Sequence, residues 1–478
     1  MERRTFLKIL SSAGIVSLVS PTFAMEVCKN KVSKSSSALL ESAFRNPPFS
    51  SGVYTWWHWM NGNITKDGIT RDLEAMKANG IAGYQLFEAG SGIPIGPVES
   101  LSDEWVDLIL HTLKESERLG LEFAMHNCPG WSSSGGPWIT PDKAMQIITW
   151  SETKITGGKQ VRIQLPTPKH MFDYYIDTYC LAIPANMKVI PRLSILELSN
   201  RLDKDGVLTW DVPTGEWLIM RFGQTAKDQK NKSAPSKSTG LDCDKFSTEA
   251  LDYHLNCMFK RLMPTMEKIA KHSKIGLLID SYETGDQDWT SDMPAYFEQS
   301  HGYELYPFLP VLANKIVESE ESTKRFLFDF RRVRADMFAE RYYGHFQKRC
   351  KEKGIITYTE PYGGNMMEEL QVAQQLDINM GEFWCGQTVL WANYKYNRTV
   401  KQVASIAHTL GGKVVGAEAF TSEPDADKWL QYPYALKSLG DYMFTRGLSR
   451  IYFHRFAHQP HPTAAPGMTM GAWGLHFD

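Results

Sequence analysis

Eight short apolar segments with the pattern of β-strands recur along the chain, and amphipathic helical segments separate most of them. The strand-like segments are residues 52–59, 81–90, 121–131, 275–283, 355–364, 377–384, 413–421 and 449–457. The first two helical segments end at Gly80 and Gly120, and glycine is the residue most often found just past a helix end. Strand–helix alternation is typical of a parallel sheet, and eight units are the number that closes such a sheet into a barrel. We therefore predict an α/β fold, a (β/α)8 TIM barrel.

Residues 141–235 interrupt this alternation. They alternate apolar and polar residues between Pro and Gly turns, as in KQVRIQLPTP and GEWLIMRFGQT, which is the pattern of antiparallel strands. We predict an antiparallel β module inserted after the third strand, with the barrel built from residues 45–140 and 236–478. A chain of 478 residues is long enough for both parts.

The first 24 residues, MERRTFLKILSSAGIVSLVSPTFA, have the pattern of an export signal. An arginine pair precedes a moderately apolar stretch and a small-residue cleavage site, which indicates a twin-arginine signal peptide; a Sec signal or an uncleaved anchor is the alternative. The apolar core is short and contains Ser and Gly, so we expect no membrane span after signal removal. The predicted location is periplasmic or secreted, in a bacterium.

Charge and cysteine content exclude several classes of function. The chain has 52 Lys and Arg against 54 Asp and Glu, a formal net charge of −2, which supports neither nucleic-acid binding nor a polybasic membrane contact. Its seven cysteines have no CxxC spacing, so neither a zinc ribbon nor a dense disulfide framework is indicated. A neutral substrate is the expectation.

Four glutamates lie near the ends of strand-like segments: Glu283, Glu360, Glu382 and Glu418. Because an ionised Glu at the end of an apolar strand is costly to desolvate, their repetition predicts one acidic pocket at the rim of the barrel. Hydrolysis of a glycosidic bond needs one carboxylic acid and one carboxylate on opposite sides of the sugar. Glu283 and Glu418 fit that pair best, since strands four and seven face each other across a barrel mouth. Salt-bridged rim carboxylates are the alternative.

Three further acidic positions have open roles. Asp280 lies near the end of the same segment as Glu283 and either orients its neighbours or pairs with a buried arginine. Glu360 and Glu382 either bind sugar hydroxyls or hold a hard cation, which prefers oxygen ligands.

Aromatic and neutral polar residues gather in the same predicted loops. Indole rings suit the apolar C–H faces of sugars, and histidine or asparagine beside them can bind hydroxyls. The predicted substrate-binding residues of these types are Trp57, His58, His126, Asn127, Trp131, Trp384 and His454. About half of the tryptophans in such loops are expected to be packing residues. For His454, His458 and His461 we expect hydroxyl-binding or structural roles rather than a zinc site, because the segment lacks ligand spacing.

Five stretches resemble the α-L-rhamnosidases of glycoside hydrolase family 106: TWWHWMNGNITKDGITRDLEAMKANGI, FAMHNCPGWSSSGGPWITP, IDSYETGDQDWT, DINMGEFW and GAEAFTS. The resemblance implies inversion at the anomeric carbon of a rhamnose-containing oligosaccharide or polysaccharide, and a calcium ion that holds the rhamnose hydroxyls. Matching the motifs assigns the general acid to Glu283 of IDSYE and the general base to Glu418 of GAEAF, with the two labels exchangeable. It makes Glu382 of GEFW a sugar or calcium ligand.

The resemblance also implies a C-terminally truncated chain, because family members of this kind continue into further β-rich domains. Two other hypotheses therefore stay open. One is a catalytically silent carbohydrate-binding fragment, and the other is a barrel glycosidase that acts on a different sugar.

Overall fold

The computed structural model describes residues 34–90, 92–385, 389–412, 414–423, 429–465, 467–469, 471 and 474–475. The chain divides into two compact units, Met1–Gly52 and Val53–Asp478. The described part of the first unit contains helix α3 (Lys34–Arg45) and the 3-10 turn η1 (Phe49–Ser51). The predicted signal peptide lies outside the described residues. Among the helices that are described, none has the length and apolar character needed to span a membrane.

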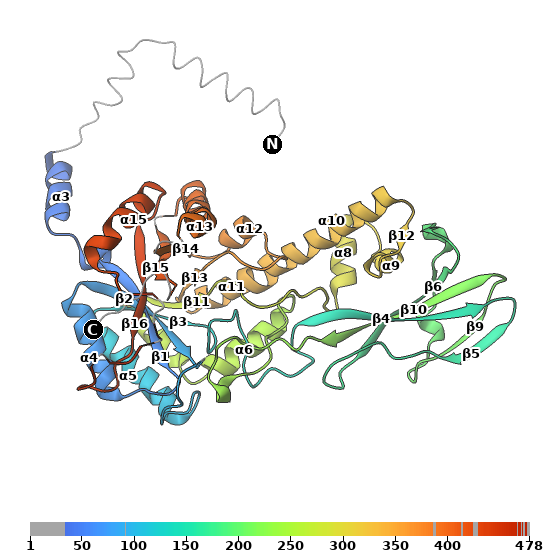
Figure 1. The fold of residues 1–478 in the computed structure, drawn as a ribbon, viewed down its shortest axis with the longest axis horizontal. Helices are drawn as coiled ribbons and strands as arrows, with labels where there is room; N and C mark the ends of the chain where they lie inside the picture. The colour runs from blue at the N-terminus through green and yellow to red at the C-terminus, as the bar shows by residue number, and fades with distance from the viewer. Residues whose placement is uncertain are drawn as a thin grey trace, which may run out of the picture. The chain divides into compact units, whose positions relative to one another are not determined.

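Eight parallel strands of the second unit close into a barrel (Figure 1). In chain order they are β1 (Val53–Met60), β2 (Ile81–Ala89), β3 (Glu122–His126), β11 (Ile275–Ile279), β13 (Ile356–Thr359), β14 (Ile378–Cys385), β15 (Val415–Ser422) and β16 (Arg450–Ala457). Each strand pairs with the next in this order, and β16 pairs with β1. The predicted closed parallel barrel is confirmed.

Helices follow most of these strands. They are α4 (Lys66–Ala78), α5 (Asp103–Leu119), α6 (Thr248–Phe259), α7 (Met263–Ala270), α8 (Met293–His301), α9 (Leu309–Leu312), α10 (Glu320–Met337), the π-helix η6 (Phe338–Gly344), α11 (His345–Lys351), α12 (Glu369–Ala373), α13 (Val389–Leu410) and α15 (Pro433–Thr445). Side chains cap the first two, because Thr65 accepts a hydrogen bond from the Gly68 amide and Ser102 accepts one from the Trp105 amide. Helix α5 ends on Gly120 in the left-handed conformation (φ 67°), as the sequence predicts.

The carboxylates differ from the prediction in their position along the strands. Strand β11 ends at Ile279, so Glu283 lies in the following loop rather than on the strand. Strands β14 and β15 continue past Glu382 and Glu418, which are direct partners in the parallel pair. Their pairing continues to Cys385 and Ser422, and for that reason these two glutamates project from inside the strands.

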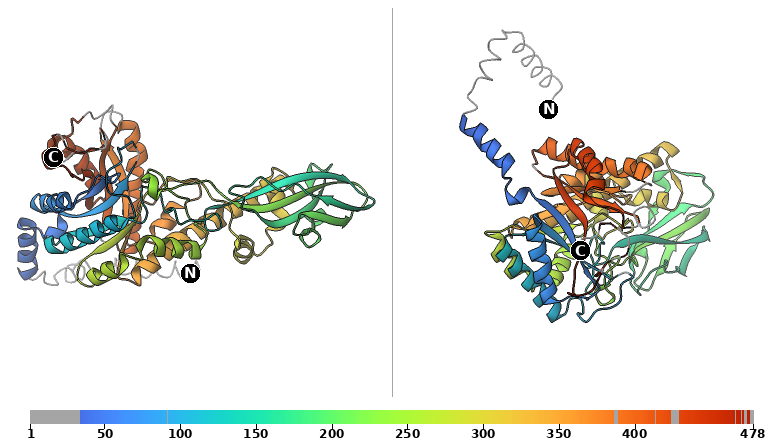
Figure 2. Two further views of the ribbon diagram at one scale, coloured as in Figure 1. Left: turned by 90° about the horizontal axis from the view of Figure 1, so that it is seen from below. Right: turned by 60° about the vertical axis from the view of Figure 1, so that its left-hand side comes forward.

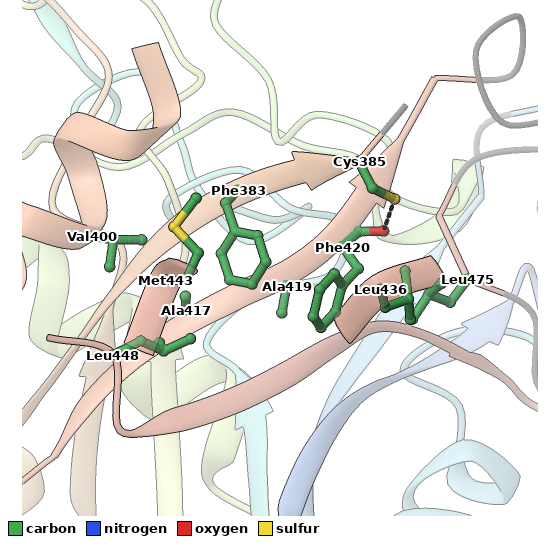
Figure 3. Close-up of a cluster of buried hydrophobic side chains, with 10 residues drawn as sticks. All are labelled: Phe383, Cys385, Val400, Ala417, Ala419, Phe420, Leu436, Met443, Leu448 and Leu475. Carbon is green, nitrogen blue, oxygen red and sulfur yellow. Dashed lines mark hydrogen bonds between the residues drawn. The ribbon is translucent and has the colours of Figure 1, made fainter. Parts of the chain in front are cut away.

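The alternation of side chains along β14 and β15 explains how these glutamates come to face the barrel interior. Residues on the opposite face of the strands pack outward against helices in one apolar cluster, which Figure 3 shows. Its members are Phe383, Cys385, Val400, Ala417, Ala419, Phe420, Leu436, Met443, Leu448 and Leu475. Because successive side chains of a strand point to opposite faces, burying Phe383 and Ala417 outward turns Glu382 and Glu418 inward.

Between β3 and β11 the chain forms an antiparallel sheet with the strand order β4-β10-β6-β8. These strands are β4 (Gln146–Thr156), β6 (Ile176–Pro184), β8 (Leu196–Glu197) and β10 (Glu216–Ala226); Figure 2 shows β4, β6 and β10 as long neighbouring strands. Two smaller sheets accompany it: β5 (Gln160–Gln164) with β9 (Val207–Asp211), and β7 (Val189–Ile190) with β12 (Ile316–Val317). These strands enclose an apolar cluster of their own that includes Cys180, Trp210 and Ile219.

Candidate active site

A pocket of about 680 Å³ opens among the C-terminal parts of the barrel strands and the loops that follow them. Its chemically active lining residues are Trp56, His58, Trp131, Lys232, Asp280, Glu283, Glu382, Trp384, Glu418, His454 and Arg455. The volume is suitable for a small ligand, and aromatic rings combined with convergent polar groups are typical of a substrate site.

The pocket brings together eight of the twelve predicted site residues. They are His58, Trp131, Asp280, Glu283, Glu382, Trp384, Glu418 and His454. The other four, Trp57, His126, Asn127 and Glu360, are buried and do not line the pocket.

Trp57 faces the outer side of β1. Its indole N–H donates a hydrogen bond of 3.0 Å to Asp72 Oδ2, and the side chain has no exposed surface. Trp56 and His58, one position to either side, line the pocket instead. Side chains alternate between the two faces of a strand, so Trp56 and His58 share the pocket face and Trp57 lies on the other. The same alternation could have identified Trp56 in the sequence.

His126 supports the end of β11 rather than the pocket surface. Its Nδ1 lies 2.8 Å from the Cys128 carbonyl oxygen, and its Nε2 accepts a hydrogen bond of 3.4 Å from the Asp280 amide. Burial lowers the pKa of His126 to about 4, so the ring is neutral at neutral pH. Asn127 is structural in the same way, because its amide donates to the carbonyl oxygens of Ser133 and Leu278.

Buried carboxyl groups dominate the electrostatics of the pocket floor. Burial raises the pKa of Glu360 well above its usual value, and the charges of Asp280, Glu418 and Glu382 raise it further. Burial likewise raises the pKa of Asp280. Glu360 accepts a hydrogen bond from the Tyr362 hydroxyl, and a hydrogen bond with Glu360 opposes the rise in the pKa of Asp280.

Glu418 is the buried member of the predicted catalytic pair. Burial, and next the neighbouring Glu382 carboxylate, raise the pKa of Glu418 well above its usual value, while a hydrogen bond from Thr421 opposes the rise. His454 Nδ1 lies 3.7 Å from Glu418 Oε1. The Arg455 guanidinium is also buried here, and desolvation lowers the pKa of Arg455 to about 10 against the opposing effect of Glu418.

Glu283 has a different environment on the other side of the pocket. Its side chain is 39% exposed, and Glu283 Oε2 forms an ion pair with the Lys232 ammonium. The two predicted catalytic glutamates therefore lie in one pocket, one buried among other acids and one solvated beside a cation.

Sequence reasoning missed Lys232 and Arg455. Lys232 lies in a polar run after the antiparallel strands, and Arg455 lies in the last barrel strand, so neither has a local signal that relates it to the acidic residues. Their place in the pocket depends on the fold.

The histidines near the C-terminus take separate places. His454 lines the pocket, whereas His458 Nδ1 lies 2.7 Å from Asp72 Oδ2 and its Nε2 accepts a hydrogen bond from the Thr65 amide. Within the described residues, no three His, Cys, Asp or Glu side chains are grouped so as to hold a metal ion.

A match to a known protein family covers most of this chain. The chain matches the model of glycoside hydrolase family 106, α-L-rhamnosidase, over residues 45–179 and 169–478. The chain belongs to this family.

This glycoside hydrolase 106 member is similar in sequence to one curated protein and in structure to one solved rhamnosidase. A protein of Formosa agariphila named "Putative beta-glucuronidase" is 40% identical over 470 residues, which cover 92% of this chain and 40% of that protein. The structure of a rhamnosidase from Novosphingobium sp. PP1Y superposes with a TM-score of 0.82 at 24% identity, covering 91% of this chain and 58% of the other. The chain thus spans less than two thirds of the length of either protein.

Proposed function

We propose that the protein is an inverting α-L-rhamnosidase that acts on rhamnose-containing oligosaccharides or polysaccharides. The observation that carries the proposal is that Glu283, from the loop after β11, and Glu418, from β15, line one pocket together with Trp131 and Trp384. The family match supports the sugar. In this mechanism one carboxyl group protonates the leaving oxygen while the other activates water on the opposite face of the ring.

The environments of the two glutamates indicate which one acts as general acid and which as general base. The resemblance assigns the general acid to Glu283 and the general base to Glu418. The raised pKa of Glu418 supports the exchanged labels, because a higher pKa favours the protonated form that a general acid needs. Activated leaving groups distinguish the two, since loss of the general acid slows dinitrophenyl substrates less than phenyl substrates.

Replacing either glutamate tests the proposal directly. We expect Glu283→Gln and Glu418→Gln each to lower kcat/KM on an aryl α-L-rhamnoside by about 10²- to 10⁴-fold, as removal of a general acid or base does. Glu321→Gln is the matched control, because Glu321 lies exposed on α10, where it pairs with Arg325. Full activity in either pocket variant would reject its catalytic role.

A second candidate is β-glucuronidase activity, because a relative that is 40% identical has that name. The described pocket lining includes two cations, Lys232 and Arg455, that could hold a uronate carboxylate. The four lining carboxyl groups, Asp280, Glu283, Glu382 and Glu418, oppose a uronate only while they are ionised, and burial raises the pKa of Asp280 and Glu418. A panel of aryl glycosides that includes the α-L-rhamnoside and the β-D-glucuronide separates the two activities. Rhamnose binding by calorimetry without any turnover would indicate the silent binding fragment.

We also propose calcium binding near Glu382. Mutual repulsion among the carboxyl groups of Glu360, Asp280, Glu418 and Glu382 is a feature that a hard cation would relieve. Against this, the described side chains contain no group of three acidic or histidine ligands. The side chains as placed do not form the site, so no step of the mechanism depends on the ion.

We propose that residues 141–235 act as an inserted β module. The antiparallel pairing of β4 and β6 with β10 and a separate apolar cluster support this. Cooperative unfolding of the isolated segment would test its independence, and an unfolded segment would contradict it.

Export to the periplasm or the exterior is our proposal for the location, supported by the arginine pair and apolar stretch of residues 1–24. A folded reporter fused to these residues should leave the cytoplasm. Replacing Arg3 and Arg4 by Lys should retain it there, and export of that variant would contradict the twin-arginine route.

A further inference from the structure

Glu283 is a candidate catalytic group with a partly exposed side chain on a loop. It lies in the loop after β11, whereas Glu418 projects from within a barrel strand. A glutamate side chain has three rotatable bonds, and at 39% exposure its packing leaves several rotamers accessible. Acid–base chemistry needs the carboxylate in one orientation toward the substrate. Some contact must therefore select that orientation.

Lys232 provides such a contact from a distant part of the sequence. Its ammonium group forms the ion pair with Glu283 Oε2, and both side chains line the same pocket. Lys232 belongs to the segment that leaves strand β10 and runs toward helix α6. Its side chain is 51% exposed, so it contributes little to the core of the fold.

The backbone at Lys232 is held by two other loops of the pocket. The Lys232 carbonyl oxygen accepts a hydrogen bond of 3.1 Å from the Trp131 amide, and the next residue, Ser233, accepts one of 2.8 Å from the Gly90 amide. The approach is close enough that a Cβ on Gly130 would lie 2.1 Å from the Lys232 carbonyl oxygen. A lysine whose main chain is fixed on two sides is a suitable anchor for a mobile carboxylate.

We propose that Lys232 is a positioning residue that fixes the side chain of Glu283 in its working orientation. The proposal rests on the function proposed above and adds a residue that acts through Glu283 rather than on the sugar. The ion pair is partly solvated, so its contribution is modest, as for other exposed pairs.

A double-mutant cycle tests this dependence. Lys232→Met, Glu283→Gln and the double variant are assayed on phenyl α-L-rhamnoside, whose leaving group needs protonation, so that the rate depends on Glu283 whether it acts as acid or as base. We expect Lys232→Met to lower kcat about threefold to tenfold with little change in KM, and Lys232→Arg to retain most of the activity. In the Glu283→Gln background we expect the same Lys232→Met substitution to change kcat less than about twofold.

Lys230→Met is the matched control. Lys230 lies two residues away in the same segment, is exposed, pairs with Asp228 and does not line the pocket. Its kinetics should equal those of the wild type. Equal losses from Lys232→Met in both backgrounds, or no loss in either, would overturn the positioning role. A wild-type protein without activity on any aryl glycoside would instead overturn the proposed function, and the role of Lys232 with it.

Discussion

The buried ion pair between Lys245 and Asp242 gives the sharpest prediction for stability. Both side chains are inaccessible to solvent. Lys245 Nζ also lies 2.5 Å from Ser134 Oγ, and it sits 4.7 Å from the centroid of the Tyr342 ring. The pair therefore connects the loop after β3, the segment before α6 and the π-helix η6. We predict that Lys245→Met is among the most destabilising single substitutions in the chain.

The magnitude follows from the group that Lys245→Met would leave behind. Asp242 would stay buried with its charge uncompensated, a situation that costs about 3–5 kcal/mol. The amide of Cys243, at 2.9 Å, and the hydroxyl groups of Ser132 and Ser134 still donate to the carboxylate, so the lower end of this range is expected. About 3 kcal/mol is a large share of the roughly 5–15 kcal/mol by which proteins are usually stable.

Urea denaturation followed by tryptophan fluorescence measures the effect as a change in the midpoint. Lys437→Met is the control, because Lys437 forms an exposed pair with Asp441 on α15 and should contribute about 0.5 kcal/mol or less. The double variant Asp242→Asn with Lys245→Met should recover part of the loss, since it removes both charges. A loss below about 1 kcal/mol for Lys245→Met, or no recovery in the double variant, would refute the reasoning.

Two further predictions concern pH and metal. Burial raises the pKa of Glu88 from 4.5 to about 7, so the stability from its protonated form is present below about pH 4.5 and is lost as the pH rises through 7. The free energy of unfolding of the wild type should therefore decrease, relative to that of Glu88→Gln, by about 3 kcal/mol between pH 4 and pH 8, at about 1.4 kcal/mol per unit of pKa shift. An equal difference in urea midpoint between the two proteins at both pH values would contradict this. If calcium binds among the carboxylates, exhaustive chelation should lower both the melting temperature and the rate on an aryl rhamnoside, and re-added calcium should restore them. Unchanged values after chelation would remove the ion from the proposal.

The barrel could be predicted because its signals are local. Each strand segment is apolar over a short run, and Thr65, Ser102 and Gly120 mark helix boundaries through contacts within a few residues. The ends of the strands were less predictable. The predicted strand segment continues past Ile279 to Glu283, but there the backbone bonds to a neighbouring loop, as in the hydrogen bond from the Tyr282 amide to the Tyr362 carbonyl oxygen.

The acidic site was predictable in part for the same reason. Glutamates in or just after the C-terminal parts of the strands converge because parallel strands end at one edge of a barrel. The orientation of neighbours was decided by packing instead. Trp57 faces Asp72 while Trp56 faces the pocket, although both belong to the same aromatic run.

The sequence by itself determined the class of fold and the acids that line its pocket, because strand patterning and the position of a carboxylate at a strand end depend on nearby residues. The tertiary structure decided which acids are buried and which are solvated, and it supplied the cations. Lys232 is 51 positions from Glu283 and reaches it only through the folded loops. Charge interactions of this kind depend on distance in space and on burial, which a linear pattern does not contain.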